Sequence, residues 1–210
     1  HWATAAADTL RWRGLAVYGV DGTTMRIADT ADNEIVFGRP RSGRSAGAYP
    51  QLRLVALMVL RAHLLLDWVP GSYDTNEQTL ARELWRRLPE RCVVVVDKGF
   101  INYAVFHFIQ SQGAERHWLC RAKANLKWEV VRHLGPHDDL VRITINRSLR
   151  KHHPELPEFI YARAIGYHRR GFRPQFLLTS LLDPTAYPAT EITELYHERW
   201  ELELSFDEVK

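Results

Sequence analysis

The stretch that decides the fold of this 210-residue chain is Arg91-Cys-Val-Val-Val-Val-Asp97. Its unbroken apolar run, rich in β-branched side chains, favours a strand buried on both faces, as in the middle of an α/β sheet. Helices are predicted on either side of it, over residues 76–88 and 102–112, and Pro89 ends the first of them. The sequence therefore predicts an α/β fold in which a buried strand ends at Asp97.

A second aspartate follows an apolar run in the same way. Leu15–Val20 leads into Asp21-Gly22-Thr23, a turn or bulge signal after which the chain is expected to continue extended. Ligands bind at the carboxyl ends of strands in open α/β sheets, and an ionised carboxylate there is costly unless it is paired or binds a metal. An aspartate that closes a strand is also common in ordinary turns, so neither residue alone identifies a site.

The rest of the chain suggests a core and an insertion. Residues 30–49 are expected to form a polar, Gly-rich loop. Residues 52–66 are expected to form two strands or one long bent strand, closed by Pro70-Gly71. From residue 117 to residue 182, β-branched and aromatic residues alternate with polar ones, which predicts a β-rich segment. The predicted division is a core of residues 1–116 and 183–210 with a β-rich insertion of residues 117–182.

The last fifteen residues, Tyr196-His-Glu-Arg-Trp-Glu-Leu-Glu-Leu-Ser-Phe-Asp-Glu-Val-Lys210, contain no Pro or Gly and predict one helix that begins near Ala189, capped by Thr190 or Thr193. At 100° per residue, one arc of about 60° holds four polar side chains. They are Tyr196, Arg199, Glu203 and Lys210. An adjacent apolar stripe is expected to dock on a core; it consists of Leu195, Leu202, Phe206 and Val209. A salt-bridged surface helix is the competing interpretation, because Arg199 and Glu203 are four residues apart.

Asp21, Asp97 and Glu203 together offer three hard oxygen donors, with no Arg or Lys dedicated to either strand end. Such donors suit Mg²⁺, or Mn²⁺ as its substitute. Two ions about 3.5–4 Å apart would activate a water or a 3′-hydroxyl and stabilise the leaving oxygen of an in-line phosphodiester displacement. Backbone phosphates near the cut would be held by Tyr196, Arg199 and Lys210. A weaker set of phosphate contacts is predicted on the Gly-rich loop, at Arg39, Arg41 and Arg44.

The order Asp…Asp…Glu, with a β-rich stretch between the second and the third, resembles the DDE domain of bacterial insertion-sequence transposases. Asp21-Gly-Thr-Thr resembles the first-Asp motif of that family. Asp97-Lys-Gly-Phe resembles the second, in which Arg is commoner at the second place. The end of the chain matches the family signature Tyr-x2-Arg-x3-Glu-x6-Lys at all four positions, from Tyr196 to Lys210. The resemblance runs from about Leu15 to the end.

The resemblance implies a ribonuclease H-like mixed sheet flanked by helices, with Asp21 and Asp97 on neighbouring strands and Glu203 on a helix beside them. It also implies a metal-dependent enzyme that cleaves the ends of a DNA element and joins them to target DNA, in some members through a hairpin. The implied partners are double-stranded DNA and a second copy of the protein in a synaptic dimer. The implied location is the bacterial cytoplasm, in association with the nucleoid.

Two other functions stay open: a stand-alone metal-dependent DNA nuclease of the same fold, and a truncated remnant that binds DNA without cutting it. The chain is expected to be cut at both ends, because it begins without Met and stops inside a predicted helix. Joining of a free 3′-hydroxyl to target DNA would separate a transposase from a nuclease. Loss of metal-dependent cleavage on substitution of Asp97 would separate an enzyme from a remnant.

The composition is that of an ordinary globular protein. The chain is 46% hydrophobic and 25% charged, and its net charge of +3 is too small to establish nucleic-acid binding. Basic residues nevertheless cluster at residues 121–127, 147–151 and 169–173, which suits a polyanion.

Residues 54–68 are interrupted by Arg61 and His63 and so do not predict a membrane span. Cys92 and Cys120 are expected to be buried free thiols. Packing is preferred over base stacking for Trp118 and Trp128.

Overall fold

The run of valines forms β6 (Cys92–Val96), and all five of its residues are buried. It pairs in parallel with β7 (Arg116–Arg121), and α5 (Tyr103–Ser111) connects the two strands. The side chain of Asn102 caps α5 by accepting hydrogen bonds from the backbone N–H groups of Ala104 and Val105. The strand and the helix predicted over residues 91–112 are therefore confirmed. The structure is a computed structural model that describes residues 2–42, 45–47, 49–168 and 174–209.

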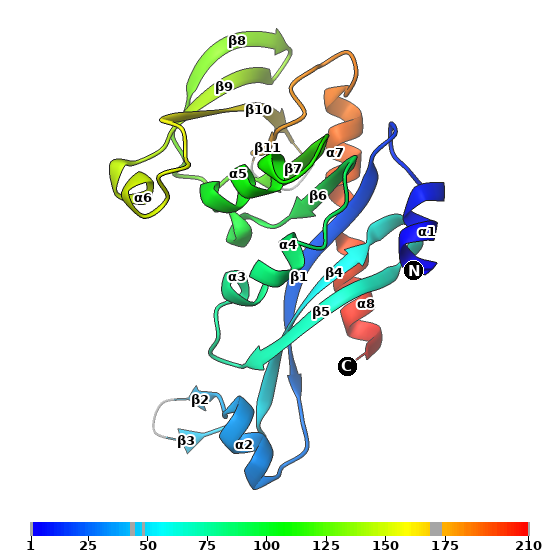
Figure 1. Cartoon of the computed structure of the whole chain (residues 1–210), viewed down its shortest axis with the longest axis vertical. Helices are drawn as coiled ribbons and strands as arrows, with labels where there is room; N and C mark the ends of the chain where they lie inside the picture. Colours follow the sequence, from blue (N-terminus) through cyan, green and yellow to red (C-terminus); the bar gives the residue numbers. More distant parts are fainter. Residues whose placement is uncertain (1, 43–44, 48, 169–173, 210) are drawn as a thin grey trace. The chain divides into compact units, whose positions relative to one another are not determined.

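The described chain forms two compact units. The first comprises His1–Leu10, Tyr18–Leu88 and Trp200–Lys210. Its antiparallel strands are β5 (Leu64–Ser72), β4 (Gln51–Val59) and most of β1 (Ala16–Arg26), in that order. Figure 1 shows α3 and α4 on one side of these strands and α8 on the other. The helices and short elements of this unit are α1 (Trp2–Thr9), α2 (Ala31–Phe37), β2 (Arg41–Ser42), β3 (Ser45–Ala46), η1 (Leu60–Ala62), α3 (Glu77–Leu80), α4 (Arg82–Trp85) and α8 (Trp200–Val209).

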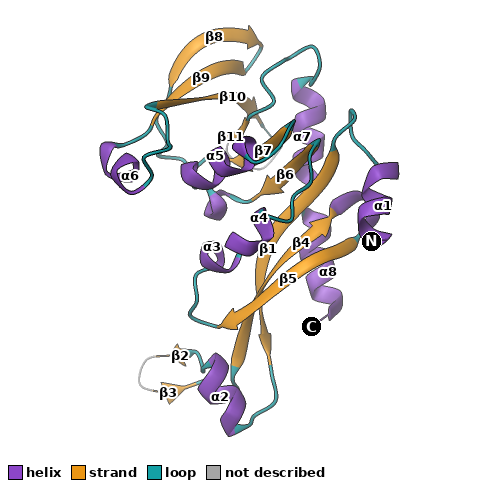
Figure 2. Ribbon diagram, viewed as in Figure 1, coloured by secondary structure: helices purple, strands orange, loops and turns teal. Residues whose placement is uncertain are grey.

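The second unit comprises Arg11–Val17 and Pro89–Arg199. Its strands follow the order β6-β7-β11-β10-β9-β8, in which the β6–β7 pair is parallel and the other pairs are antiparallel. Figure 2 shows this succession, with α6 in the connection between β9 and β10. The remaining elements are η2 (Lys98–Phe100), β8 (Glu129–Gly135), β9 (Asp138–Thr144), α6 (Arg147–His152), β10 (Phe159–Tyr167), β11 (Gln175–Thr179) and α7 (Ala189–His197).

Asp21 lies inside β1 and not at the end of a strand, so the turn or bulge predicted at Asp21-Gly22-Thr23 is wrong. β1 continues to Arg26 and pairs residue by residue with β4, with Asp21 opposite Ala56. This long antiparallel ladder outweighs the local preference of Gly for a turn. Pro70 and Gly71 likewise lie within β5, where the edge position tolerates a residue without a backbone N–H.

The stretches on either side of this ladder differ from their predictions. The polar loop expected over residues 30–49 contains α2, capped by the Thr30 hydroxyl on the N–H of Asn33, and the two short strands β2 and β3. Residues 52–66 do contribute two strands. The single helix expected over residues 76–88 is instead α3 followed by α4, and three apolar side chains of this stretch are buried. They are Leu80, Leu84 and Leu88.

The end of the chain forms two helices, so the prediction of one continuous helix is wrong. α7 ends at His197, and the next two N–H groups bond three residues back, Glu198 to the Leu195 carbonyl and Arg199 to that of Tyr196. Pro188 is the N-cap of α7, in place of the predicted Thr190 or Thr193. Leu195, Leu202 and Phe206 are buried as predicted. Because of the break, Tyr196 and Arg199 belong to the second unit and Glu203 to the first.

The predicted β-rich segment does form β8 to β11 but also contains α6. β7 begins at Arg116, next to the predicted start of the insertion, and the boundary between core and insertion stays a prediction. Both cysteines are free and buried, as predicted. Among the described residues, no helix has the length and apolar character needed to cross a membrane.

Candidate active site

Asp97 follows β6 directly and lies beside a cation from the neighbouring strand. The parallel register pairs Val96 with Cys120, so the next residues, Asp97 and Arg121, emerge side by side. Arg121 Nη2 lies 3.5 Å from Asp97 Oδ1, and the two side chains are 29% and 30% exposed. The expectation that no Arg or Lys would serve this strand end is therefore wrong for Asp97. The carboxylate is open to solvent but partly neutralised.

Arg121 is held on its other side by Gln175 of β11. The side-chain carbonyl oxygen of Gln175 accepts a hydrogen bond from Arg121 Nη1 at 3.4 Å and one from the Tyr167 hydroxyl at 2.8 Å. The ring of Tyr167 packs edge-on against His197, the last residue of α7, with ring centroids 6.0 Å apart. A chain of contacts thus runs from Asp97 across β7, β11 and β10 to α7. Sequence reasoning missed Arg121 and Gln175 as site residues.

Tyr196 lies within electrostatic range of Asp97, and both Tyr196 and Arg199 are buried, with exposed fractions of 5% and 6%. The Arg199 guanidinium carbon is 6.0 Å from the centre of the Tyr196 ring. The pKa of the Tyr196 phenol is raised to about 12, chiefly by burial; Arg199 and Arg121 oppose the rise, and the charge of Asp97 adds to it. The phenol is therefore protonated at neutral pH and can donate a hydrogen bond to an anion.

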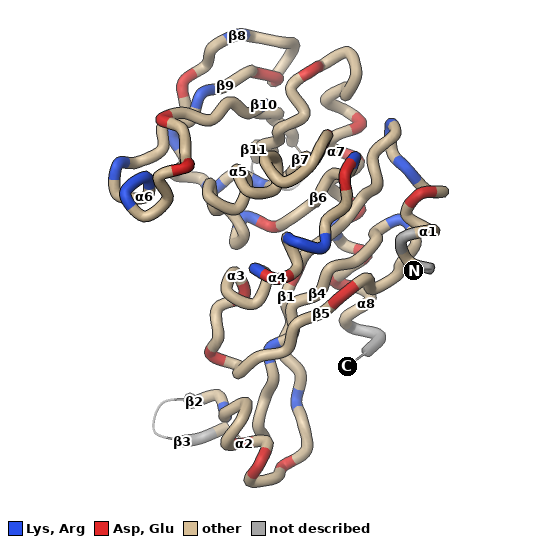
Figure 3. Tube along the Cα trace, viewed as in Figure 1, with Lys and Arg blue, Asp and Glu red and all other residues tan. Residues whose placement is uncertain are grey.

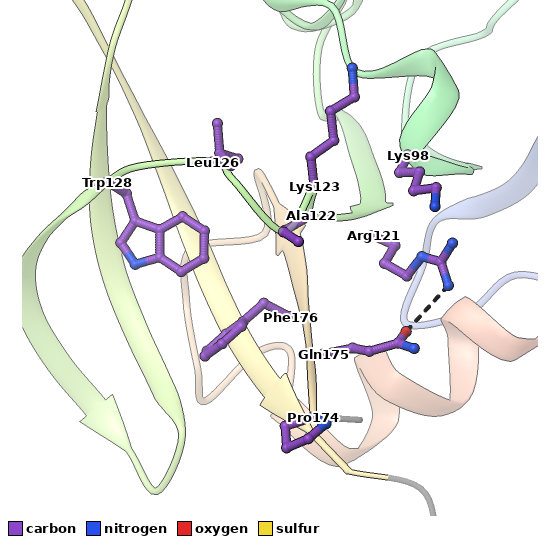
Figure 4. Close-up of a pocket in the computed structure, with 10 residues that line it drawn as sticks. Lys98, Arg121, Ala122, Lys123, Leu126, Trp128, Pro174, Gln175 and Phe176 are labelled. Carbon is purple, nitrogen blue, oxygen red and sulfur yellow. Dashed lines mark hydrogen bonds between the residues drawn. The ribbon is translucent and has the colours of Figure 1, made fainter. Parts of the chain in front are cut away.

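A pocket of about 550 Å³ opens next to Arg121. Figure 4 shows the charged ends of Lys98 and Arg121 on one side of it and the rings of Trp128 and Phe176 on the other. Lys98 and Lys123 are exposed, so three cations of this wall can meet an anionic ligand. The two rings meet edge-on, with centroids 5.3 Å apart. Trp118, by contrast, is 1% exposed and stacks on a core phenylalanine.

In the first unit, α8 packs on the face of β1 that bears Asp21. Gly19 makes this possible, because a Cβ there would lie 2.7 Å from Leu60 Cδ2 and 3.2 Å from Leu202 Cδ1. Side chains alternate along a strand, so Asp21 points to the same face as Gly19. Glu203, which follows Leu202 in α8, is half-buried, as Asp21 is. The structure thus places both predicted carboxylates of this unit on packed elements.

Gly22 meets the opposite face of the strand, and this explains the second residue of the Asp-Gly-Thr motif. A Cβ on Gly22 would lie 2.6 Å from the Glu77 carboxyl carbon. Glu77 forms an ion pair with Arg53 at 3.2 Å. The N–H of Gly22 donates to Asp21 Oδ1 at 2.8 Å, which orients that carboxylate. The absence of a Cβ on this residue leaves room for the Glu77 carboxylate, and the glycine does not lie in a turn.

The predicted metal ligands come from both units: Asp21 and Glu203 from the first, Asp97 from the second. Within the part of the chain that the structure describes, no group of three His, Cys, Asp or Glu side chains could hold a metal ion. The three-carboxylate metal site therefore stays a prediction. The donor chemistry does suit a hard divalent cation, since all three are carboxylates and each side chain retains partial exposure.

The predicted phosphate contacts at Lys210 and on the loop of Arg39, Arg41 and Arg44 have different outcomes. Lys210 and Arg44 lie outside the described residues, as does the side chain of Arg41. Arg39 pairs with the carboxylates of Asp29 and Glu34, which raise the pKa of its guanidinium. Figure 3 shows basic residues gathered on α6, where the sequence cluster at residues 147–151 lies. DNA contact by each of these groups stays a prediction.

Arg121 could have been found from the sequence if the two strands had been recognised as parallel neighbours. Aligning the ends of two apolar runs, residues 92–96 and 118–120, places residue 97 beside residue 121. Gln175 carried no such signal, because its role depends on a contact between β11 and β7 that links residues far apart in the chain.

Comparison with known proteins bears on what this arrangement does. A family described as "Transposase DDE domain" matches residues 12–210. The chain is 32% identical over 199 residues to the transposase InsG for insertion sequence element IS4 of Escherichia coli strain K12, a match that covers 95% of this chain and 45% of that protein. The chain thus spans less than half the length of this curated relative.

Among solved structures, the chain resembles the piggyBac transposase in a synaptic complex with hairpin DNA. The TM-score is 0.51 at 10% sequence identity, over 90% of this chain and 39% of that one. At this identity the likeness concerns the fold, and it confirms the predicted ribonuclease H-like α/β class. The family match over nearly the whole chain and the identity to a bacterial transposase agree with the motifs around Asp21, Asp97 and Glu203. The chain belongs to the transposase DDE domain family.

Proposed function

We propose that this chain is the catalytic domain of a DNA transposase, which cleaves the ends of an insertion element and transfers them to target DNA. The observation that carries the proposal is the placement of Asp97 in a member of this family. Its carboxylate follows a buried strand, lies 3.5 Å from Arg121, and adjoins a pocket with two further cations. Carboxylates beside cations provide what phosphodiester displacement requires: ligands for a metal and partners for phosphate.

Asp21, Asp97 and Glu203 would hold divalent cations, Mg²⁺ or Mn²⁺, and we propose two ions. Carboxylate oxygens are the donors that such hard cations prefer, and the three side chains are neither fully buried nor fully exposed. When bound, the metal supplies activation of the attacking oxygen and charge stabilisation of the leaving oxygen. Arg121, the cation that neighbours Asp97, lines the pocket.

The chain's own cations would bind and orient the DNA backbone. Arg121, Lys98 and Lys123 are accessible and would take the phosphates closest to the cut. The Tyr196 phenol of α7, which is protonated at neutral pH, and Arg199, which follows α7, would complete the phosphate site. Further contacts along the duplex are proposed for Lys210 and for the loop that carries Arg39, Arg41 and Arg44.

The proposed substrate is double-stranded DNA, both element ends and target, in the bacterial cytoplasm at the nucleoid. We further propose that two copies of the full-length protein act together in a synaptic complex. The relative from Escherichia coli is a transposase of an insertion sequence, and the structural neighbour is a transposase in a synaptic complex with hairpin DNA. These properties of relatives motivate the proposal for this chain.

The test uses the chain with supercoiled plasmid and with a duplex that carries a free 3′-hydroxyl, in Mn²⁺ and in EDTA. We expect metal-dependent nicking and covalent joining of the duplex to the plasmid. Asp97→Asn should abolish both reactions, because it removes the charge while keeping the shape. Asp74→Asn is the matched control, since Asp74 is exposed in the turn before α3. It should behave as wild type.

Each result separates one alternative. Nicking without joining would indicate a nuclease and would overturn the strand-transfer proposal. DNA binding without cleavage, equal in wild type and Asp97→Asn, would indicate a non-catalytic remnant. Cleavage that survives Asp97→Asn would remove Asp97 from the catalytic site.

A further inference from the structure

The most deeply buried charges among the described residues form an ion pair that none of the proposed chemistry uses. Arg163 of β10 is 0% exposed and Asp138 of β9 has a side chain 6% exposed. Arg163 Nε donates to Asp138 Oδ1 at 2.6 Å, and Nη2 donates to Oδ2, so the pair is bidentate. Because desolvation offsets the attraction between such charges, an apolar pair of similar volume would stabilise the fold as well or better. Stability alone therefore does not account for this pair.

The remaining nitrogen of Arg163 reaches a different element. Nη1 donates to the backbone carbonyl of Tyr187, the residue just before Pro188, the N-cap of α7. α7 begins without a side-chain cap, and this contact instead satisfies the carbonyl of the residue that precedes its N-cap. The Tyr187 ring also stacks on Trp12, with centroids 5.6 Å apart and planes 26° apart. Arg163 thus joins the buried sheet to the start of α7.

The segment before α7 is itself ordered by short-range contacts. The carboxylate of Asp183 accepts hydrogen bonds from the N–H groups of Thr185 and Ala186. These bonds lower the pKa of Asp183, and the charge of Arg163 lowers it further. Arg13 donates to the Ala186 carbonyl at 2.9 Å and pairs with Glu191 in the first turn of the helix. The start of α7 is therefore held in place by several hydrogen bonds and an ion pair.

The other end of α7 carries the residues proposed to bind phosphate. Tyr196 is in its last turn, within electrostatic range of Asp97 and Arg121, and Arg199 follows the helix. α7 has nine residues, about 13 Å at 1.5 Å per residue, so its first turn and its last belong to one short, continuously hydrogen-bonded helix. We infer that Arg163, whose charge is neutralised by Asp138, is a positioning residue that fixes the position of Tyr196 and Arg199 relative to Asp97. The part of this inference that concerns catalysis rests on the proposed function.

The test replaces the pair with apolar side chains of similar volume, Asp138→Leu with Arg163→Met. The control is Glu129→Leu with Arg142→Met, which removes a 2.6 Å Arg–Glu pair of β8 and β9 in the same sheet. Thermal unfolding, amide hydrogen exchange and Mn²⁺-dependent cleavage are measured on the whole chain. We expect unfolding at an unchanged or higher temperature for the buried replacement, since the desolvation cost is removed.

Hydrogen exchange gives the readout that does not depend on catalysis. Loss of the contact at Tyr187 should speed exchange of the α7 amides by up to about ten-fold, the value of one hydrogen bond, with exchange in β10 and β11 unchanged. The kcat for cleavage should fall by about 100-fold, because a misplacement of about 1 Å has that effect, while KM for DNA changes little. The control should alter neither quantity.

Unchanged exchange in α7 would overturn the inference. Faster exchange in α7 with full cleavage activity would also overturn it, since positioning would then not matter for the reaction. If wild type itself cleaves no DNA, the proposed function fails while the exchange result still decides whether Arg163 mounts α7. Should the double variant not fold, Arg163→Lys keeps a charge for Asp138 but removes the fork that reaches Tyr187. It should give the same exchange and kcat changes.

Discussion

Arg121 stands beside Asp97 because two parallel strands end at the same level. The pairing of Val96 with Cys120 leaves the guanidinium 3.5 Å from the carboxylate, and Gln175 holds the guanidinium from its other side. A cation in this position has two effects that oppose one another. It attracts the phosphate of a DNA strand and it repels a metal ion from the carboxylate.

Arg121→Gln should therefore separate these effects. Affinity for Mn²⁺ should rise by up to roughly five-fold, as expected from removing a partly exposed charge pair, while affinity for DNA falls. Isothermal titration with Mn²⁺ and fluorescence anisotropy with duplex DNA measure the two quantities. Arg132→Gln is the control for the change in net charge, because Arg132 is exposed on β8. A loss of affinity for both ligands would contradict the opposed roles.

The cations of the pocket should dominate the salt dependence of DNA binding. If Lys98 and Lys123 each contact one phosphate, then Lys98→Gln and Lys123→Gln should each lower the slope of log K against log salt by about 0.9. Binding isotherms at several NaCl concentrations give the slopes. Lys127→Gln removes the same charge from an exposed residue outside the pocket wall and should lower the slope less. Equal slopes for all three variants would place the DNA elsewhere.

Gly19→Ala should destabilise the first unit. The added methyl group would overlap Leu60 and Leu202, both buried, and overpacking of this kind costs about 1–3 kcal/mol. Urea unfolding measures the change. Gly99→Ala is the matched control, because a Cβ on Gly99 meets no heavy atom within 4 Å. If Gly19→Ala were neutral, close packing of α8 on β1 would not be needed for stability.

Stability should fall at alkaline pH. Burial raises the pKa of the Cys92 thiol from 9.0 to about 12, and burial raises that of Tyr103 from 10.0 to about 12. Above about pH 9 these groups ionise in the unfolded chain before they ionise in the folded one. Their contribution is thus complete below pH 9 and is lost as pH rises towards 12.

Cys92→Ala should make the decline of the melting temperature between pH 8 and about pH 10 shallower than in wild type. Val93→Ala, a change at the next buried position, should lower the melting temperature by the same amount at every pH. Parallel curves for wild type and Cys92→Ala would show that this thiol does not contribute to the pH dependence.

The sequence allowed prediction of those elements whose causes are local. The valine run and the helical pattern of residues 102–112 suffice for β6 and α5. The break between α7 and α8 has no such cause, since Glu198 keeps helical dihedral angles, φ −60° and ψ −17°. The N–H groups of Glu198 and Arg199 bond to i−3 carbonyls there, and Leu195 and Leu202 belong to different units. Only tertiary contacts decide this.

The candidate site shows the same division. Motifs around Asp21, Asp97 and Glu203 were recognisable because each is contiguous or regularly spaced in the chain. Arg121 and Gln175 were not, since their roles arise from strand pairing. The glycine of the first motif was recognised for the wrong reason. It looked like a turn residue, whereas a carboxylate on α3 fills the space beside it.

The continuation of β1 through Asp21 makes the two aspartates unequal in freedom. Asp21 sits in a regular ladder, so its backbone is fixed and its carboxylate can adjust through side-chain rotation alone. Asp97 follows the last residue of its strand and leads into the single turn of η2, where the chain can yield more easily. Fixing a metal-binding residue in one conformation costs conformational entropy, and most of this cost comes from ordering Asp97 and the residues after it. A metal ion would thus bind one carboxylate whose backbone is already fixed. Ion binding should therefore reduce backbone motion at residues 97–100 more than at residues 20–22.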